Sequence, residues 1–293
     1  MAEKENKTFR SPLAYENSKF LNSPDGRILR ILAEYSEPLA RFRRERIQDT
    51  VVFFGSARFH SRTEAQDALE LLERPGSAAP APLQEQMKVA RAGVEMARYY
   101  EEARRLAFLL TKWTETLAGK RHRFVVTTGG GPGIMEAANR GAHEAGGKTI
   151  GLNIHLPFEQ MPNRFITPEL NFEFHYFFMR KLWFAYLAKA LIVFPGGFGT
   201  FDELFEILTL AQTEKLAKKI VVLMYGKEYW KTVVNFQALA DTGVISPNDL
   251  NLFHMVDSPE EGFEYLKENL IKYHLGPQPP KMKMMPEIAK TRP

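Results

Sequence analysis

The sequence predicts an α/β protein with a Rossmann-like parallel sheet covered by helices on both faces, preceded by an N-terminal helical arm. Three observations lead to this expectation. Short apolar segments alternate with longer segments of helical periodicity, as in βαβ units. The apolar segments are nearly continuous, which is typical of strands buried on both faces. Glycine-rich turns follow several of them, at the sheet edge where α/β proteins bind ligands.

The composition and net charge of the chain exclude several classes of function. The chain has 293 residues, 44% of them hydrophobic, enough for one large domain or two smaller ones. Its net charge of +4 is too small to indicate nucleic-acid binding. The absence of cysteine excludes disulfides and thiolate chemistry. The polar N-terminus and the short apolar runs indicate no signal peptide and no membrane span, so we expect a cytoplasmic protein with no membrane partner.

The two ends of the chain differ from its middle. Residues 1–49 are expected to form the arm, with an irregular part up to residue 24 and a helix over 25–48 that Pro38 should kink or divide. Four arginines crowd the end of this helix, either to complement its dipole or to bind an anion. Residues 276–293 form a basic tail that we expect to be flexible.

Residues 50–275 are expected to form the α/β domain. An insertion at about 61–88 contains two helical pieces around the loop signal of residues 73–82. Strands are expected over residues 51–54, 124–127, 149–154, 172–177, 191–194, 220–224 and 253–256. Helices are expected over residues 90–117, 132–145, 179–189, 200–212, 228–240 and 259–273. A long loop with three prolines covers residues 155–170.

The first glycine-rich turn runs from Gly129 to Gly133. Glycines let the backbone approach an anion, and the following helix offers unpaired N–H groups. The turn lacks the dinucleotide fingerprint G-x-G-x-x-G, because the residue three positions after Gly131 is Ile134, and it lacks the Lys-Ser/Thr pair of a P-loop. Ligand binding and simple close packing both remain open for this turn.

The second turn, from Pro195 to Thr200, is more specific. Thr200 can cap the next helix and also donate to a phosphate. Glu203 follows within that helix, where stabilisation by the dipole is the alternative explanation for an acid. Arg180 and Lys181 open the preceding helix, and they either neutralise a phosphate or form an exposed basic surface.

Together these motifs resemble one family. PGGFGT with Glu203 matches the pattern P-G-G-x-G-T-x-x-E, and it follows Met179-Arg180-Lys181, the GIMEAA turn and Gly55-Ser56. The combination resembles the LONELY GUY (LOG) family of nucleoside 5′-monophosphate phosphoribohydrolases, often mislabelled "possible lysine decarboxylase", over roughly residues 50–240. The arm, the insertion and the segment GLNIHLPFEQMPN are similar to the longer bacterial members. AMP or another purine monophosphate is then the expected substrate, and cytokinin production is in doubt.

The resemblance implies roles for particular residues. Arg180 and Glu203 would form the catalytic pair, with Glu203 stabilising positive charge on the ribose or activating water, and Arg180 orienting Glu203. It also implies a homodimer or higher homo-oligomer, with no cofactor and no metal. The expected substrate contacts are Gly55, Ser56, Arg58, Thr128, Gly130, Gly131, Glu159, Gln160, Asn163, Lys181, Gly196, Gly197, Gly199 and Thr200.

Three other functions compete with this interpretation. A non-catalytic carrier of a phosphorylated ligand would use the same cradle but would not need both Arg180 and Glu203. A lysine decarboxylase would need a lysine in a pyridoxal-phosphate context, which the sequence does not offer. A dinucleotide-dependent oxidoreductase is disfavoured by the spacing of the first turn. The histidines show no metal-ligand spacing.

Overall fold

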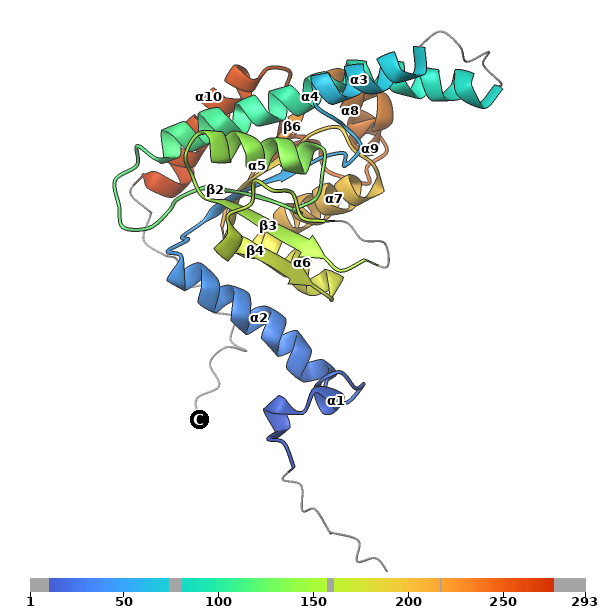
Figure 1. Cartoon of the computed structure of the whole chain (residues 1–293). Coiled ribbons are helices and arrows are strands. Elements are labelled where there is room, and N and C mark those ends of the chain that lie inside the picture. Colours follow the sequence, from blue (N-terminus) through green and yellow to red (C-terminus); the bar gives the residue numbers. More distant parts are fainter. Residues whose placement is uncertain (1–10, 74–80, 157–160, 217, 277–293) are drawn as a thin grey trace, which may run out of the picture.

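The computed structural model describes residues 11–73, 81–156, 161–216 and 218–276. Its centre is a parallel sheet with the strand order β4-β3-β2-β1-β5-β6-β7 (Figure 1). The order reverses between β1 and β5, which are paired in the middle of the sheet. The strands are β1 Thr50–Phe54, β2 Val125–Thr128, β3 Thr149–Ile154, β4 Asn171–Phe174, β5 Ala188–Val193, β6 Val221–Tyr225 and β7 Phe253–Val256.

Helices cover both faces of this sheet, as expected from the sequence. The helices of the described residues are α1 Ser18–Leu21, α2 Arg27–Arg44, α3 Arg62–Glu73, α4 Ala81–Thr114, α5 Ile134–Glu144, α6 Phe177–Leu187, α7 Phe198–Gln212, α8 Lys227–Val233, α9 Phe236–Asp241 and α10 Pro259–Leu270. A π-helical turn, Ile271–Leu275, continues α10. No helix among the described residues combines the length and apolar character needed to cross a membrane.

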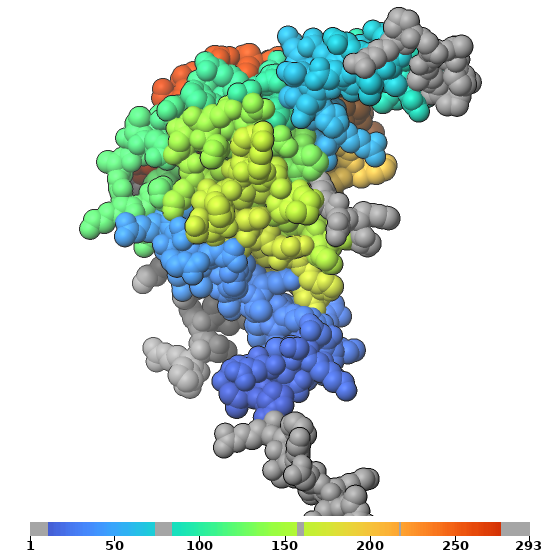
Figure 2. All heavy atoms as spheres, viewed as in Figure 1, coloured from blue at the N-terminus to red at the C-terminus, as the bar shows by residue number. Residues whose placement is uncertain are grey.

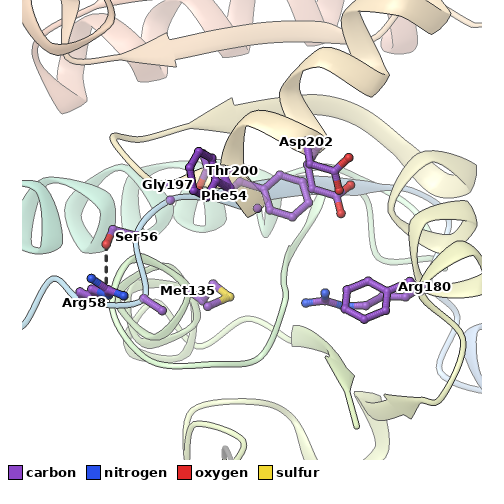
Figure 3. A pocket seen from close by; sticks show the side chains of 14 residues that line it. Phe54, Ser56, Arg58, Met135, Arg180, Gly197, Thr200 and Asp202 are labelled. Carbon is purple, nitrogen blue, oxygen red and sulfur yellow. Dashed lines mark hydrogen bonds between the residues drawn. The ribbon is translucent and has the colours of Figure 1, made fainter. Parts of the chain in front are cut away.

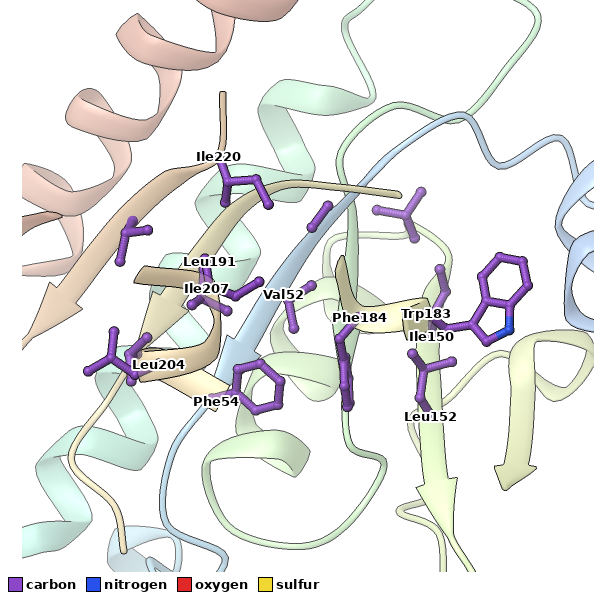
Figure 4. Close-up of a cluster of buried hydrophobic side chains, with 14 of the residues drawn as sticks. Val52, Phe54, Ile150, Leu152, Trp183, Phe184, Leu191, Leu204, Ile207 and Ile220 are labelled. Atoms are coloured by element: carbon purple, nitrogen blue, oxygen red, sulfur yellow. The ribbon is translucent and has the colours of Figure 1, made fainter. Parts of the chain in front are cut away.

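Alternating residues of the central strand feed two separate cores. Val51 and Phe53 pack with α4, α5 and α10 on one face. Val52 and Phe54 pack with α2, α6, α7, α8 and α9 on the other, where Trp183 and Phe184 are buried (Figure 4). Because both faces of β1 are apolar, its residues are buried without the polar alternation of a one-sided sheet. The doubly covered sheet fixes the positions of the turns at its carboxyl edge.

Several predicted elements differ from the structure. Helix α4 begins at Ala81 rather than residue 90, and the loop predicted over 73–82 lies largely outside the described residues. The helix predicted over 228–240 is two helices, because Asn235 accepts a hydrogen bond from the backbone of Ala238 and starts α9. The strand predicted over 172–177 ends at Phe174, and α6 starts at Phe177.

Pro38, which the sequence predicted to kink or divide the arm helix, does not divide it. Helix α2 runs through it from Arg27 to Arg44. Proline cannot donate the N–H that would bond the carbonyl of Glu34, four residues earlier. Trp183 replaces that donor, since its Nε1 lies 2.9 Å from the Glu34 carbonyl oxygen. The helix therefore continues because a side chain of the domain satisfies the carbonyl that the proline leaves free. Helix α1 and the start of α2 project from the rest of the described chain in Figure 2.

Candidate active site

A cavity of about 580 Å³ lies at the carboxyl ends of β1 and β5, where the strand order reverses (Figure 3). This is the place where open α/β sheets bind their ligands. Its walls come from the end of β1 and the loop that follows, from the first turns of α5 and α6, and from the start of α7. The lining residues are Phe54, Gly55, Ser56, Ala57, Arg58, Met135, Phe177, Arg180, Gly197, Phe198, Gly199, Thr200, Asp202 and Glu203.

The start of α7 presents free backbone donors to this cavity. The amides of Thr200 and Phe201 bond the carbonyl of Gly197. The amides of Gly197, Phe198 and Gly199 have no acceptor within the described part of the chain. Free N–H groups at a helix N-terminus form an anion-binding site. The sequence predicted a phosphate cradle of the amides of Gly196, Gly197, Gly199 and Thr200. In the structure the amide of Thr200 bonds the carbonyl of Gly197, and the amide of Phe198 is free beside those of Gly197 and Gly199.

Gly196 lies behind the cavity wall rather than in its lining. Its carbonyl accepts a hydrogen bond of 2.6 Å from the hydroxyl of Tyr229 in α8. A Cβ at Gly196 would collide with the side chain of Thr200 and lie 3.0 Å from the backbone nitrogen of Ser56. Gly196 is therefore required for close packing between the two loops that follow β1 and β5. Sequence reasoning missed Tyr229, since no motif links it to the loop.

Glu203 lies in the second turn of α7 and is only 8% exposed. Lys181 of α6 places its Nζ 3.3 Å from Glu203 Oε1, and the same ammonium lies 2.7 Å from both Asp202 and Glu206. Burial raises the pKa of Glu203 above its usual range, while the charges of Lys181 and Arg180 oppose that rise. Burial alone would lower the pKa of Lys181, but its three carboxylates raise it. The Lys181 ammonium is therefore the shared cation of three carboxylates.

Arg180 enters the cavity from the first turn of α6. Its Nε donates a 2.7 Å hydrogen bond to the carbonyl of Leu152, and its guanidinium lies over the ring of Phe184. Burial lowers its pKa, and the charge of Glu203 opposes that change. A Cβ at Gly129 would collide with the guanidinium, so this glycine makes room for it. The structure places no ion pair between Arg180 and Glu203, and the cation in contact with Glu203 is Lys181.

The first glycine turn, Gly129 to Gly133, packs against the loop that lines the cavity. Gly133 has a φ of +70°, and a Cβ there would collide with the carbonyl oxygen of Ser56. The amide of Ile134 bonds that same carbonyl at 3.0 Å. The turn is thus packed against the loop after β1, and Met135 of α5 reaches the cavity.

A buried polar network holds this turn in place. The side-chain amide of Asn163 donates to the carbonyls of Gly130 and Gly131, both at 3.1 Å, and to Asn139 at 2.9 Å. Thr128 donates to Asn139 and accepts from the amide of Gly130. Thr128, Gly130, Gly131 and Asn163 were expected to contact substrate, but the structure places them outside the cavity lining, where they fix the shape of the turn.

The other predicted site residues divide into three groups. Gly55, Ser56 and Arg58 line the cavity, and the hydroxyl of Ser56 accepts a hydrogen bond from the backbone of Arg58. Lys181 lies one layer behind it, against Glu203. Glu159 and Gln160 lie outside the described residues. Among the described residues, no group of three or more His, Cys, Asp or Glu side chains is arranged to hold a metal ion.

Known proteins are similar in sequence to the region of the chain that carries the motifs. A family model described as "possible lysine decarboxylase" matches residues 135–266. The cytokinin riboside 5′-monophosphate phosphoribohydrolase LOG7 of Arabidopsis thaliana is 31% identical over 148 residues, covering 49% of this chain and 66% of the relative. The corresponding LOG enzyme of Oryza sativa subsp. japonica is 30% identical over 156 residues, covering 52% and 62%. The match thus spans slightly less than two thirds of these relatives.

Solved structures were found as well. The molybdenum cofactor binding protein of Rippkaea orientalis is 18% identical, with a TM-score of 0.42 and coverage of 75% of this chain and 94% of that one. The Moco carrier protein of Chlamydomonas reinhardtii is 21% identical, with a TM-score of 0.43 and coverage of 77% and 99%.

The family match and the sequence relatives agree with the motifs found in the sequence. Both motif segments, with Arg180 and with Glu203, fall within the matched residues and meet at one cavity. The parallel sheet carries that cavity at its topological switch point. Over this region the chain is similar to the LOG family.

Proposed function

We propose that the protein hydrolyses the N-glycosidic bond of a purine nucleoside 5′-monophosphate, releasing the free base and ribose 5-phosphate. One observation carries this proposal: a buried carboxylate, Glu203, lies in the same cavity as three free backbone amides at the start of α7. The amides suit a phosphate, and the carboxylate suits the developing charge on a sugar. A site for an anion alone would not need the acid.

The 5′-phosphate would bind at the start of α7. The free amides of Gly197, Phe198 and Gly199 would donate to its oxygens, and the positive end of the helix dipole would favour its charge. Arg58 lines the same cavity and adds a cation near its mouth. The requirement for a phosphate would therefore arise from backbone geometry, which a nucleoside without phosphate cannot use.

Glu203 would act at the glycosidic carbon. Departure of the base takes the electron pair of the C1′–N bond and leaves positive charge on the ribose, which an adjacent carboxylate stabilises. A water molecule then adds its oxygen to C1′, and Glu203 would accept the proton that the water loses. That proton is available for the departing base. Lys181, in contact with Glu203, would favour the ionised form needed for both steps.

Arg180 would contribute binding and charge. Its guanidinium is anchored by Leu152 and lies in the lining of the cavity, so it would contact the substrate from the side opposite α7. AMP is the first proposed substrate. A cytokinin riboside monophosphate is the second, because the sequence relatives are named for acting on it.

The test is release of base from a panel of nucleoside monophosphates, with the corresponding nucleosides as controls. We expect release of adenine from AMP and at least a hundredfold less from adenosine, since loss of two or more charge-assisted hydrogen bonds removes this much binding energy. Binding of AMP without release of base would instead favour a non-catalytic carrier of phosphorylated ligands. Equal rates with AMP and adenosine would contradict the role assigned to the start of α7.

We also propose that two copies associate through the exposed apolar side chains of α6 and α7. Phe198, which is 97% exposed, and Phe177, which is 55% exposed, both line the cavity, and Phe178 of the same helix as Phe177 is also exposed. A large exposed aromatic cluster of this kind is typical of an interface. Light scattering should give a dimer mass that Phe198→Ser and Phe178→Ser reduce. Val244→Ser, which removes an exposed apolar side chain elsewhere, should leave the mass unchanged.

A further inference from the structure

The N-terminal arm contacts the helix that carries Arg180 through Glu34 of α2. The Glu34 carboxylate accepts hydrogen bonds from the backbone amides of His175, at 2.7 Å, and Tyr176, at 3.3 Å. Tyr176 is the N-cap of α6, and it makes no side-chain capping hydrogen bond of its own. The arm thus supplies a negative charge at the start of α6, where the helix dipole favours one.

The backbone carbonyl of Glu34 makes a second contact with α6. Because Pro38 cannot donate to it, the Glu34 carbonyl is free to accept the bond from Trp183 Nε1. Trp183 lies in the second turn of α6 and is buried against Phe42 of α2, with ring centroids 5.3 Å apart. Glu34 therefore contacts α6 on both sides of Arg180, before its first turn through the carboxylate and within its second turn through the carbonyl.

The backbone of Arg180 is hydrogen-bonded to Tyr176, the residue whose amide Glu34 accepts from. The carbonyl of Tyr176 accepts a 3.1 Å hydrogen bond from the backbone amide of Arg180, while the amide of Tyr176 is held by Glu34. The side chain of Arg180 is then fixed by the bond from its Nε to Leu152. A shift at the start of α6 would move this guanidinium relative to β3. In Figure 1, α2 lies beside the β4 edge of the sheet, on the side of α6.

We propose that Glu34 is a positioning residue for Arg180, so that the arm sets the geometry of the candidate active site without entering it. The inference rests on the proposed function only for the role of Arg180 in that site. The placement of its guanidinium by Glu34 is a structural claim, which can be measured whether or not the protein cleaves a nucleotide.

The experiment uses the full chain and three variants. Glu34→Ala removes the two carboxylate contacts and keeps the backbone carbonyl. Glu34→Gln keeps one acceptor oxygen. Glu37→Ala is the matched control, because Glu37 lies one turn further along α2 and, among the described residues, its ion pair is with Arg41 of the same helix. The first readout is hydrogen exchange of the Arg180 Nε–H group by NMR, with the signal assigned by its loss in Arg180→Lys.

We expect Glu34→Ala to accelerate exchange of this group about tenfold, Glu34→Gln to have a smaller effect, and Glu37→Ala to have none. Exchange of Trp230 Nε1, which is buried and bonded to Tyr225 far from the arm, should stay unchanged in all variants. Unchanged exchange at Arg180 in Glu34→Ala, or equal acceleration at Arg180 and Trp230, would overturn the proposal, the latter by showing only general destabilisation.

Kinetics give the second readout. If the wild type cleaves AMP, Glu34→Ala should lower kcat/KM about tenfold, and the same change in an Arg180→Ala background should lower the residual value less than twofold. Equal losses in both backgrounds would contradict an action through Arg180. If the wild type cleaves no nucleotide, the proposed function fails, while the exchange measurement still decides the role of Glu34.

Discussion

Lys181 Nζ lies 3.3 Å from Glu203 Oε1, and it joins the two helices that bound the candidate active site. The contact matters because Glu203 is buried, which favours its protonated form, whereas the proposed reaction needs the carboxylate. Asp202 and Glu206 share the same ammonium. The cluster therefore keeps one cation beside an acid whose pKa burial raises.

This arrangement predicts a shift in the pH profile when Lys181 is replaced. On the acid side, kcat/KM should rise as Glu203 ionises, with an apparent pKa above that of an ordinary glutamate. Lys181→Met removes the charge that lowers this pKa, so the acid limb should move to higher pH. Lys181→Arg keeps the charge and should leave the limb in place. An acid limb that stays where it is in Lys181→Met would exclude this role.

The close packing at Gly196 predicts a difference between two adjacent glycines. A Cβ at Gly196 would collide with Thr200 and crowd Ser56, whereas a Cβ at Gly197 would meet no atom within 4 Å. Gly196→Ala should lower the free energy of unfolding by roughly 1–3 kcal/mol, the usual cost of overpacking. Gly197→Ala should change it by less than about 0.5 kcal/mol. Chemical denaturation measures both, and equal values would contradict the packing described for the loop.

The sequence predicted most of the strands, turns and helix starts at the carboxyl edge of the sheet, because these features depend on neighbouring residues. The β-branched runs and the glycine turns at Gly129 and Gly196 depend on neighbouring residues, so their strands and helix starts could be recognised. The contact of Lys181 with Glu203 was missed because it joins two helices across β5. Asn163 was predicted to contact substrate from its loop position, and that position alone could not reveal the buried network in which its amide is used.

The arm shows the same limit. Pro38 was expected to kink or divide its helix, because the missing N–H is visible in the sequence. The compensating donor, Trp183, lies far along the chain and could not be paired with Glu34 before the fold was known. Local rules therefore identified the missing donor but not the tertiary contact that replaces it.

Lys218 gives a prediction on stability that is independent of the active site. Burial, with a further contribution from Lys189, lowers its pKa to about 7 in the folded chain. Between pH 7 and the unfolded value near 10.4, the unfolded state binds more protons, so this residue makes stability rise with pH. Lys218→Gln, which can still donate to the Tyr186 carbonyl, should be more stable than the wild type at pH 7.

The expected gain is on the order of 1 kcal/mol, because partial exposure to solvent screens the charge, and it should vanish near pH 10. Thermal or chemical unfolding across this range, with Lys219→Gln at the exposed neighbouring position as the control, measures it. A gain for Lys218→Gln that is independent of pH would show that the lysine charge is not responsible.

The most direct test of the proposed reaction is a comparison of Glu203→Gln with Asp202→Asn. Both residues contact Lys181 and both line the cavity, but only Glu203 is buried. Release of adenine and ribose 5-phosphate from AMP would be followed for each variant, together with AMP binding by calorimetry. We expect Glu203→Gln to lose turnover by about 10²–10⁴-fold while still binding AMP, and Asp202→Asn to stay within a few-fold of the wild type. Turnover retained in Glu203→Gln, with a folded protein, would contradict the central role given to this carboxylate.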